Sequence, residues 1–232
     1  MTTLRDAWEE NAHDWIEWAR TQEHDGFWEG TWPELHAVLP PPAGGLVVEV
    51  GCGEGRCGRK LIDLGHPVVG IEYSSTLAGA ARAAAQPLQV VRADAADLPL
   101  ADGIAAIVVA CMSLHDIDDL TGAIREIARV LLPAGHLCVA MVHPFASAQD
   151  PAAMHTQLTV VRQPYLVERR YEDHMERDGL RMSFISMHRP LSVYVSACSG
   201  AGLALTALRE FGNKSIPWLL SARFEKIASA PR

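Results

Sequence analysis

Five short apolar segments alternate with helix-forming segments in the middle of the chain, and this alternation constrains the fold more than any other feature of the sequence. The expected strands are residues 46–50, 67–71, 88–91, 104–110 and 137–142, and the expected helices are residues 56–64, 75–85 and 120–132. Strands that are apolar throughout and separated by helices are typical of a parallel sheet covered on both faces. The sequence therefore predicts a doubly wound α/β core.

The alternation stops after residue 142. Residues 146–187 are charged and contain strand-like pieces at 158–161 and 180–187, with Asp178-Gly179 as a turn signal, so we expect an inserted β-hairpin. A helix over 191–201 and two strands over 203–210 and 218–225 complete the chain. The short connection between these two strands predicts an antiparallel hairpin at the end of the sheet. The sheet should therefore have seven strands, mostly parallel, with an antiparallel strand near the end and helices on both faces.

The first forty residues contain five of the six tryptophans. Three of them, Trp8, Trp15 and Trp18, share one face of a helix because they are spaced seven and three residues apart. This face either docks on the core or forms a lid that closes a ligand site. We expect residues 1–232 to form a single domain, with residues 1–40 as the lid and residues 146–187 covering the substrate.

The charge of the chain bears on its partners and its location. The 20 basic and 28 acidic residues give a net charge of -8, which opposes binding to nucleic acid. Five scattered cysteines without a CxxC pair indicate reduced thiols in a cytosol. Because no basic leader or long apolar stretch is present, we expect a cytoplasmic protein that does not bind a membrane.

A glycine-rich loop follows the first expected strand, in the segment VVEVGCGEGR at residues 47–56. The strand ends near Glu49, and Gly51, Gly53 and Gly55 precede the next helix. Glycines allow a sharp turn and close approach of a ligand to the backbone. Residues 53–58 also satisfy GxGxxG, so a nicotinamide dinucleotide site remains an alternative on this segment alone.

Two further acids follow neighbouring strands. Glu72 ends the second strand, 21 residues after Gly51, where a carboxylate accepts hydrogen bonds from ribose hydroxyls. Asp94 and Ala95 follow the third strand, where a carboxylate and a backbone amide meet the edge of an adenine ring. These positions favour an adenosine-containing ligand.

With these motifs in order, followed by LLPAGHLCVAMVHP at residues 131–144, the chain resembles the class I S-adenosylmethionine-dependent methyltransferases of the small-molecule type, which have a Rossmann-like fold. The resemblance covers residues 47–142 most strongly. It implies that S-adenosylmethionine is the cofactor. The chain departs from the family in having Glu72 where Asp is frequent, followed by Tyr73, which should alter the adenine slot slightly without removing the ribose contact. Glu49 either orients the glycine loop or contacts the ligand amine through water. The cofactor-binding residues expected from the resemblance are Glu49, Gly51, Cys52, Gly53, Glu72, Tyr73, Asp94, Ala95, Cys111 and Met112.

Methyl transfer from a sulfonium requires an in-line approach and no metal. The expected reaction is O- or N-methylation of a small organic metabolite by a monomer or homodimer. For a hydroxyl acceptor, His143 is the first choice as general base and His115 the second, since both follow expected strands at the carboxyl edge of the sheet. Trp18, Tyr165 and Phe184 are expected to contact the acceptor. The alternatives are an NAD(P)-binding oxidoreductase and a protein that binds S-adenosylmethionine without transferring its methyl group.

Overall fold

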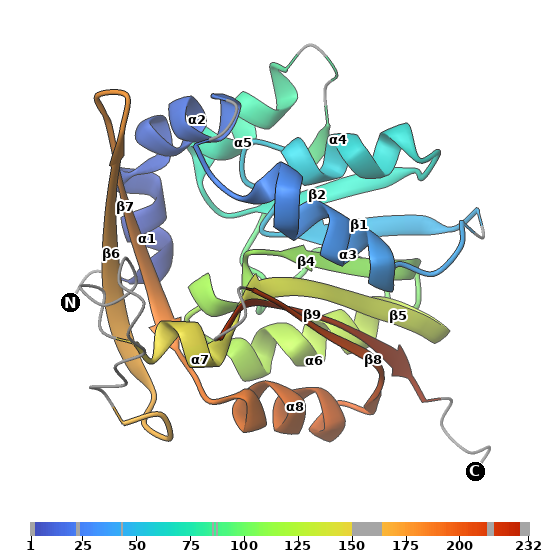
Figure 1. The fold of residues 1–232 in the computed structure, drawn as a ribbon. Helices are drawn as coiled ribbons and strands as arrows, with labels where there is room; N and C mark the ends of the chain where they lie inside the picture. The colour runs from blue at the N-terminus through green and yellow to red at the C-terminus, as the bar shows by residue number, and fades with distance from the viewer. Residues whose placement is uncertain are drawn as a thin grey trace.

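The computed structural model describes residues 3–21, 24–42, 44–84, 86, 88–149, 164–212 and 216–227. A seven-stranded sheet forms the centre of the molecule, in the order β3-β2-β1-β4-β5-β9-β8 (Figure 1). The strands are β1 (Leu46–Val50), β2 (Val68–Glu72), β3 (Gln89–Arg92), β4 (Ala105–Cys111), β5 (Leu131–Val142), β8 (Leu203–Gly212) and β9 (Pro217–Lys226).

The direction of the strands confirms the predicted fold class. Strands β1 to β5 pair in parallel, and β9 is antiparallel to both of its neighbours, β5 and β8. The chain order reverses between β1 and β4, which lie side by side. In open α/β sheets, ligands bind beyond the carboxyl ends of the strands at such a reversal.

Helices cover both faces of the sheet because side chains alternate between the two faces along each strand. Val48 of β1 packs in a cluster with α6 (Leu120–Val130) and α8 (Leu191–Gly200). Val47 packs in the opposite cluster with α3 (Trp32–Val38) and α4 (Arg56–Asp63). Helix α5 (Ser75–Arg82) contacts β2 and β3.

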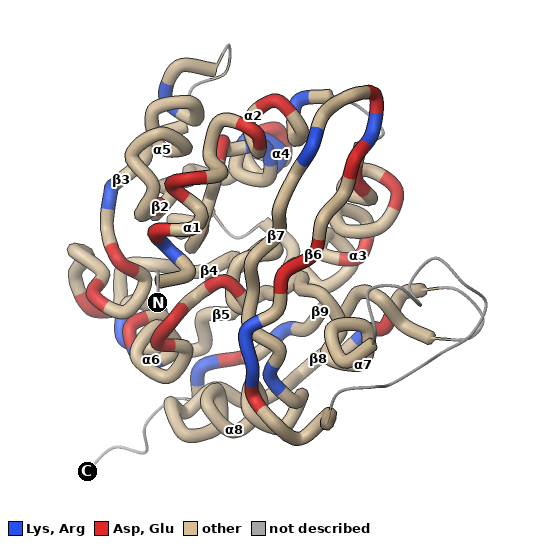
Figure 2. Tube along the Cα trace, turned by 90° about the vertical axis from the view of Figure 1, so that its left-hand side faces the viewer, with Lys and Arg blue, Asp and Glu red and all other residues tan. Residues whose placement is uncertain are grey.

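Two additions lie at the end of the sheet where the parallel strands finish (Figure 1). One consists of α1 (Leu4–Glu10), α2 (Ala12–Arg20) and a π-helical turn at Phe27–Thr31. The other is the hairpin of β6 (Arg169–Arg177) and β7 (Leu180–His188), whose turn residues Asp178 and Gly179 both have positive φ. Figure 2 shows α1 and α2 beside this hairpin, and both helices contact β7.

The main differences from the expected boundaries lie around residue 131. Helix α6 ends at Val130, and β5 begins at Leu131 rather than at residue 137, because Leu131 already pairs with Ala105 of β4. A register shift and a positive φ at Ala134 carry the strand through the Pro-Ala-Gly segment. The strand-like piece at 158–161 lies outside the described residues. Within the described part of the chain, no helix is long and apolar enough to cross a membrane.

Candidate active site

The glycine loop after β1 has a backbone that other residues adopt only with strain. Gly51, Gly53 and Gly55 have φ values of 69°, 56° and 91°. A Cβ on Gly51 would lie 2.5 Å from the Cβ of Ser113, whose hydroxyl donates to the Val50 carbonyl. The turn therefore brings the backbone close to Ser113 in a way that only glycine permits.

The buried carboxyl group of Glu72 organises the loop from the neighbouring strand. Its Oε2 accepts a hydrogen bond from the Gly53 amide at 2.8 Å, and its Oε1 accepts one from the Ser74 amide at 2.8 Å. Desolvation raises the pKa of Glu72, although the backbone hydrogen bonds act in the opposite direction. Glu72 thus ties the glycine loop to the start of α5.

A cavity of about 300 Å³ lies above this loop, at the carboxyl ends of the strands. It has the size of a small-molecule site. Seven of the ten expected cofactor residues line it, namely Gly51, Gly53, Glu72, Tyr73, Asp94, Ala95 and Met112. We call this space the cofactor cavity.

The N-terminal helix closes one side of the cofactor cavity. Asp94 accepts hydrogen bonds from the Ala96 amide at 2.9 Å and from Arg5 of α1 at 2.5 Å. The Arg5 guanidinium also lies 4.8 Å from the centre of the Tyr73 ring. Sequence reasoning missed Arg5, because nothing near position 5 indicates a partner 89 residues away.

A second contact of α1 involves Glu9 and the first turn of α5. The Glu9 carboxylate accepts hydrogen bonds from the hydroxyls of Ser74, Ser75 and Thr76 and from the Thr76 amide. Burial raises the pKa of Glu9, but these bonds outweigh it and lower the pKa to about 2. A carboxylate at a helix N-terminus is further favoured by the helix dipole.

Three expected cofactor residues do not line the cavity. Glu49 is buried behind the loop, where its Oε2 would lie 2.6 Å from a Cβ on Gly58. Burial raises its pKa well above the usual range. The Cys52 side chain packs against Gly70, and Cys111 hydrogen-bonds to the buried Cys57. Their positions favour a packing role.

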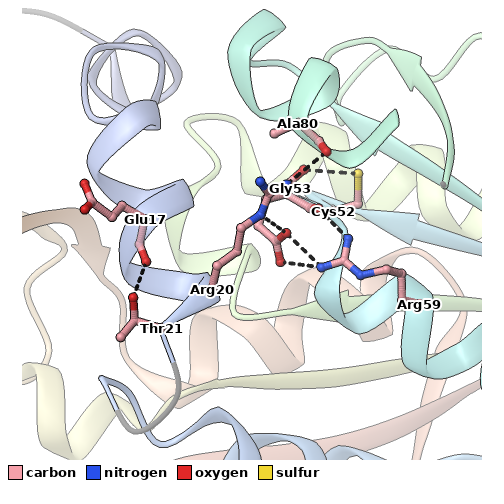
Figure 3. Close-up of polar contacts among 8 residues, drawn as sticks. Glu17, Arg20, Thr21, Cys52, Gly53, Arg59 and Ala80 are labelled. Carbon is pink, nitrogen blue, oxygen red and sulfur yellow. Dashed lines mark hydrogen bonds and ion pairs between the residues drawn. The ribbon is translucent and has the colours of Figure 1, made fainter. Parts of the chain in front are cut away.

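Figure 3 shows how α2 is fastened to the loop region. Arg20 donates to Glu54 Oε2 at 3.3 Å and to the Ala80 carbonyl at 3.1 Å. Arg59 donates to both carboxylate oxygens of the same buried Glu54. These bonds hold α2 against the helices that follow β1 and β2.

A second cavity of about 450 Å³ lies between the N-terminal helices and the β6–β7 hairpin. We call it the acceptor cavity. Its walls are aromatic, and the Trp15 and Phe184 rings meet edge to face at 6.0 Å. The aromatic residues in its lining include Trp8, Trp15, Phe27, Tyr171, Phe184 and Trp218.

The two cavities share Trp8, Trp15, Met112 and Asp116. Met112 follows β4 and has a φ of 55°, which is unusual for a residue with a side chain. Its amide donates to the Ala140 carbonyl of β5 at 2.7 Å, so the sheet holds this conformation. Strained backbone of this kind is concentrated at functional sites.

His115 and Asp116 lie in a short helical turn after β4 (Leu114–Asp116) and both line the acceptor cavity. His115 Nε2 is 3.7 Å from Asp116 Oδ1, and the same oxygen accepts a hydrogen bond from Ser186 of β7 at 2.5 Å. Burial, together with nearby Arg189, lowers the pKa of His115 to about 4. Burial raises the pKa of Asp116 to about 8. The motif SLHDIDD at the carboxyl end of β4 was the available signal for Asp116, which sequence reasoning missed.

The other expected acceptor-side residues fall outside both cavity linings, except Phe184. His143 is engaged at both ring nitrogens: Nδ1 accepts from the Phe145 amide and Nε2 pairs with Glu210. Trp18 is fully buried behind Phe184. The Tyr165 hydroxyl accepts from the Leu191 amide and its ring packs on His188. Of the two histidines expected as a general base, His115 lines the acceptor cavity and His143 does not.

The chain is similar in sequence to known methyltransferases. Residues 48–139 match the family model described as a methyltransferase domain. A probable S-adenosylmethionine-dependent methyltransferase of Mycobacterium tuberculosis is 32% identical over 116 residues, which cover 48% of this chain and 42% of that protein. The 27-O-demethylrifamycin SV methyltransferase of Amycolatopsis mediterranei is 30% identical over 158 residues, covering 60% and 57%. This chain thus spans about half the length of these curated relatives.

A solved methyltransferase structure has a similar fold. The crystal structure of an S-adenosylmethionine-dependent methyltransferase from Mesorhizobium loti has a TM-score of 0.67 and 23% identity, covering 84% of this chain and 96% of that one. The fold of this chain is therefore that of the class I S-adenosylmethionine-dependent methyltransferases, and residues 48–139 match a methyltransferase domain. S-adenosylmethionine is the cofactor of that class, as the resemblance of the motifs implied.

Proposed function

We propose that this protein transfers a methyl group from S-adenosylmethionine to an oxygen or nitrogen of a small organic acceptor held in the acceptor cavity. The observation that carries the proposal is the junction of the two cavities at Trp8, Trp15, Met112 and Asp116. A junction of this kind allows a donor in one cavity to meet an acceptor in the other in line.

The residues of the cofactor cavity suit the cofactor. In this proposal Gly51 and Gly53 pack on the methionine part and Glu72 binds the ribose hydroxyls. Asp94 and Ala95 bind the adenine edge and Met112 lies at the methyl end; the support is that all six residues line the cofactor cavity. When bound, S-adenosylmethionine supplies a methyl group on a sulfonium, whose neutral thioether is a good leaving group.

The residues around the acceptor have two tasks. Trp8, Trp15 and Phe184 exclude water and hold an apolar body by ring contacts. For a hydroxyl acceptor, the neutral imidazole of His115 takes the proton, and Asp116, once it has ionised, stabilises the resulting cation. An amine acceptor needs only to enter unprotonated.

We further propose that the chain works as a single domain, in which residues 1–40 are the lid and residues 146–187 cover the substrate. The support is that α1 and α2 meet the β6–β7 hairpin over the ends of the parallel strands (Figure 2). The names of methyltransferases among the relatives support a small-molecule acceptor.

Calorimetry with S-adenosylhomocysteine and NADH tests the cofactor. We expect micromolar binding of the first and no heat from the second. Transfer of labelled methyl groups to a metabolite library then tests the activity. Binding of S-adenosylhomocysteine without transfer to any acceptor would favour a non-transferring binder, and binding of NADH alone would reject the proposal.

A further inference from the structure

One face of strand β6 lines the acceptor cavity. Alternate residues of a strand point to the same side. Arg169, Tyr171, Asp173 and Met175 obey this spacing and all belong to the cavity lining. The start of β6 therefore presents an arginine to the acceptor.

The guanidinium of Arg169 is only partly hydrogen-bonded within the described structure. Its Nη2 donates to the Ser147 carbonyl at 2.9 Å, whereas its Nη1 is buried without a hydrogen-bond partner. Burial lowers the pKa of Arg169, but a guanidinium stays protonated in proteins. A buried cationic donor without a partner costs free energy, which an anion would offset.

Another nitrogen atom around the same cavity is also unpaired within the described part of the chain. Arg56 lies over the rings of Trp15 and Phe27 at 4.9 and 4.2 Å, and its Nη2 pairs with Asp25. Its Nη1 is buried without a partner among the described residues. Two guanidinium groups of the cavity lining, those of Arg169 and Arg56, thus each keep an unpaired donor nitrogen.

The charged residues around the acceptor cavity also favour an anionic ligand. Asp25 is compensated by Arg56, and Arg170 and Asp173 are of opposite sign. Asp116 has its pKa raised to about 8 by burial, so it is mostly protonated at neutral pH. Among the described residues of the lining, Arg169 is then a cation whose Nη1 has no partner, although the net charge of the whole protein is -8.

Resting on the proposed function, we propose that the methyl acceptor is an aromatic carboxylate whose anionic group binds Arg169. The ring fits the aromatic walls, and the planar guanidinium matches a carboxylate. Tyr171, two residues along β6, pairs with Ser186, which bonds to Asp116 at the junction with the cofactor cavity. Two residues of strand span about 7 Å. Arg169 and Ser186 therefore lie at separate points of the cavity lining.

Matched acids and amides test this assignment. The probes are 4-hydroxybenzoate, 3,4-dihydroxybenzoate and indole-3-acetate, each compared with its carboxamide. Calorimetry on protein saturated with S-adenosylhomocysteine measures binding, and methyl transfer is followed in parallel. We expect at least one acid to bind at least tenfold more tightly than its amide, a difference of about 1.4 kcal/mol. Arg169→Gln should remove the preference while leaving amide binding unchanged.

Arg181→Gln is the control. Arg181 lies on the same hairpin, is exposed, pairs with Glu176 and does not line the cavity, so the acid preference should survive. S-adenosylhomocysteine binding in all three proteins reports an intact fold and cofactor site.

Two results would overturn the carboxylate assignment: no acid bound more tightly than its amide, or a preference retained in Arg169→Gln. A wild-type protein that does not bind S-adenosylhomocysteine would instead contradict the proposed function. The two failures are therefore distinguishable.

Discussion

The guanidinium of Arg5 pairs with the carboxylate of Asp94 across the mouth of the cofactor cavity, at 2.5 Å. Helix α1 is thereby fastened to the loop after β3, at the position where the sequence placed the adenine edge. A cofactor that uses Asp94 must share it with Arg5 or displace Arg5. The pair therefore links the position of α1 to occupancy of the cavity.

Replacing Arg5 by Met should speed cofactor exchange. Exposed ion pairs contribute about 0.2–1 kcal/mol, so dissociation of S-adenosylhomocysteine should be up to about fivefold faster. Stopped-flow fluorescence detects it, because Trp8 and Trp15 line the cavity. Arg209→Met, which removes an exposed pair with Glu34 elsewhere, should leave the rate unchanged. Equal rates in wild type and Arg5→Met would mean that the pair does not hold the lid.

Replacing Glu72 by Ala should weaken S-adenosylhomocysteine binding at least tenfold. The carboxylate holds the Gly53 and Ser74 amides and is placed for the ribose, and hydrogen bonds to charged groups contribute about 1.5–3 kcal/mol each. Glu72→Gln retains one acceptor oxygen and should show a smaller loss. Calorimetry checks binding, and thermal melting checks the fold. Unchanged binding in a normally folded Ala variant would contradict the ribose assignment.

Gly51→Ala should destabilise the protein and abolish cofactor binding. A left-handed backbone costs a residue with a Cβ about 1–2 kcal/mol, and here the Cβ also meets Ser113. Gly103→Ala is the matched control, because Gly103 has a φ of 60° with nothing near its missing Cβ. Denaturant titration should show a smaller decrease in the free energy of unfolding for Gly103→Ala than for Gly51→Ala. Equal losses would mean that contact with Ser113 is unimportant.

The buried Asp116 should make stability depend on pH. Its folded pKa of about 8 lies above the usual value of 3.8, so the folded state retains the proton more tightly. The resulting stabilisation is complete below about pH 4 and is lost as pH rises to about 8. Asp116→Asn cannot ionise, so its melting temperature relative to wild type should increase between these pH values and then level off. A difference that is independent of pH would show that Asp116 ionises normally.

His115→Ala should lower kcat for a hydroxyl acceptor by about 10² to 10⁴, the usual contribution of a general base. The wild-type rate should rise with pH through about 8 as Asp116 ionises, and Asp116→Asn should remove that rise. His143→Ala serves as the comparison, since His143 caps α7 (Pro144–Ser147) outside both cavity linings, and its kcat should change little. A large loss in His143→Ala with normal turnover in His115→Ala would reverse the assignment.

Local pattern was sufficient to predict the core of this protein. The order of strands and helices from residue 46 to 142, the glycine loop at Gly51 and Gly53, and the hairpin turn at Asp178-Gly179 follow from hydrophobic periodicity and backbone preference. Hydrophobic periodicity and backbone preference both depend on a few neighbouring residues. The class of ligand could also be predicted from the sequence, because residues at the ends of parallel strands meet at one edge of the sheet.

Tertiary structure alone decided which side chains share a cavity. In the sequence, both His143 and His115 follow the end of a strand. In the structure, the two ring nitrogens of His143 bond to Glu210 and to the Phe145 amide at the start of α7. His115 instead lies beside Asp116 in the lining of the acceptor cavity. Arg5 meets Asp94, and Arg169 meets the acceptor cavity, only through docking of the lid and the hairpin. These contacts join residues far apart in the chain, and no local preference records such pairs. The sequence therefore determined the fold and the cofactor class, while long-range packing determined which side chains line the second cavity.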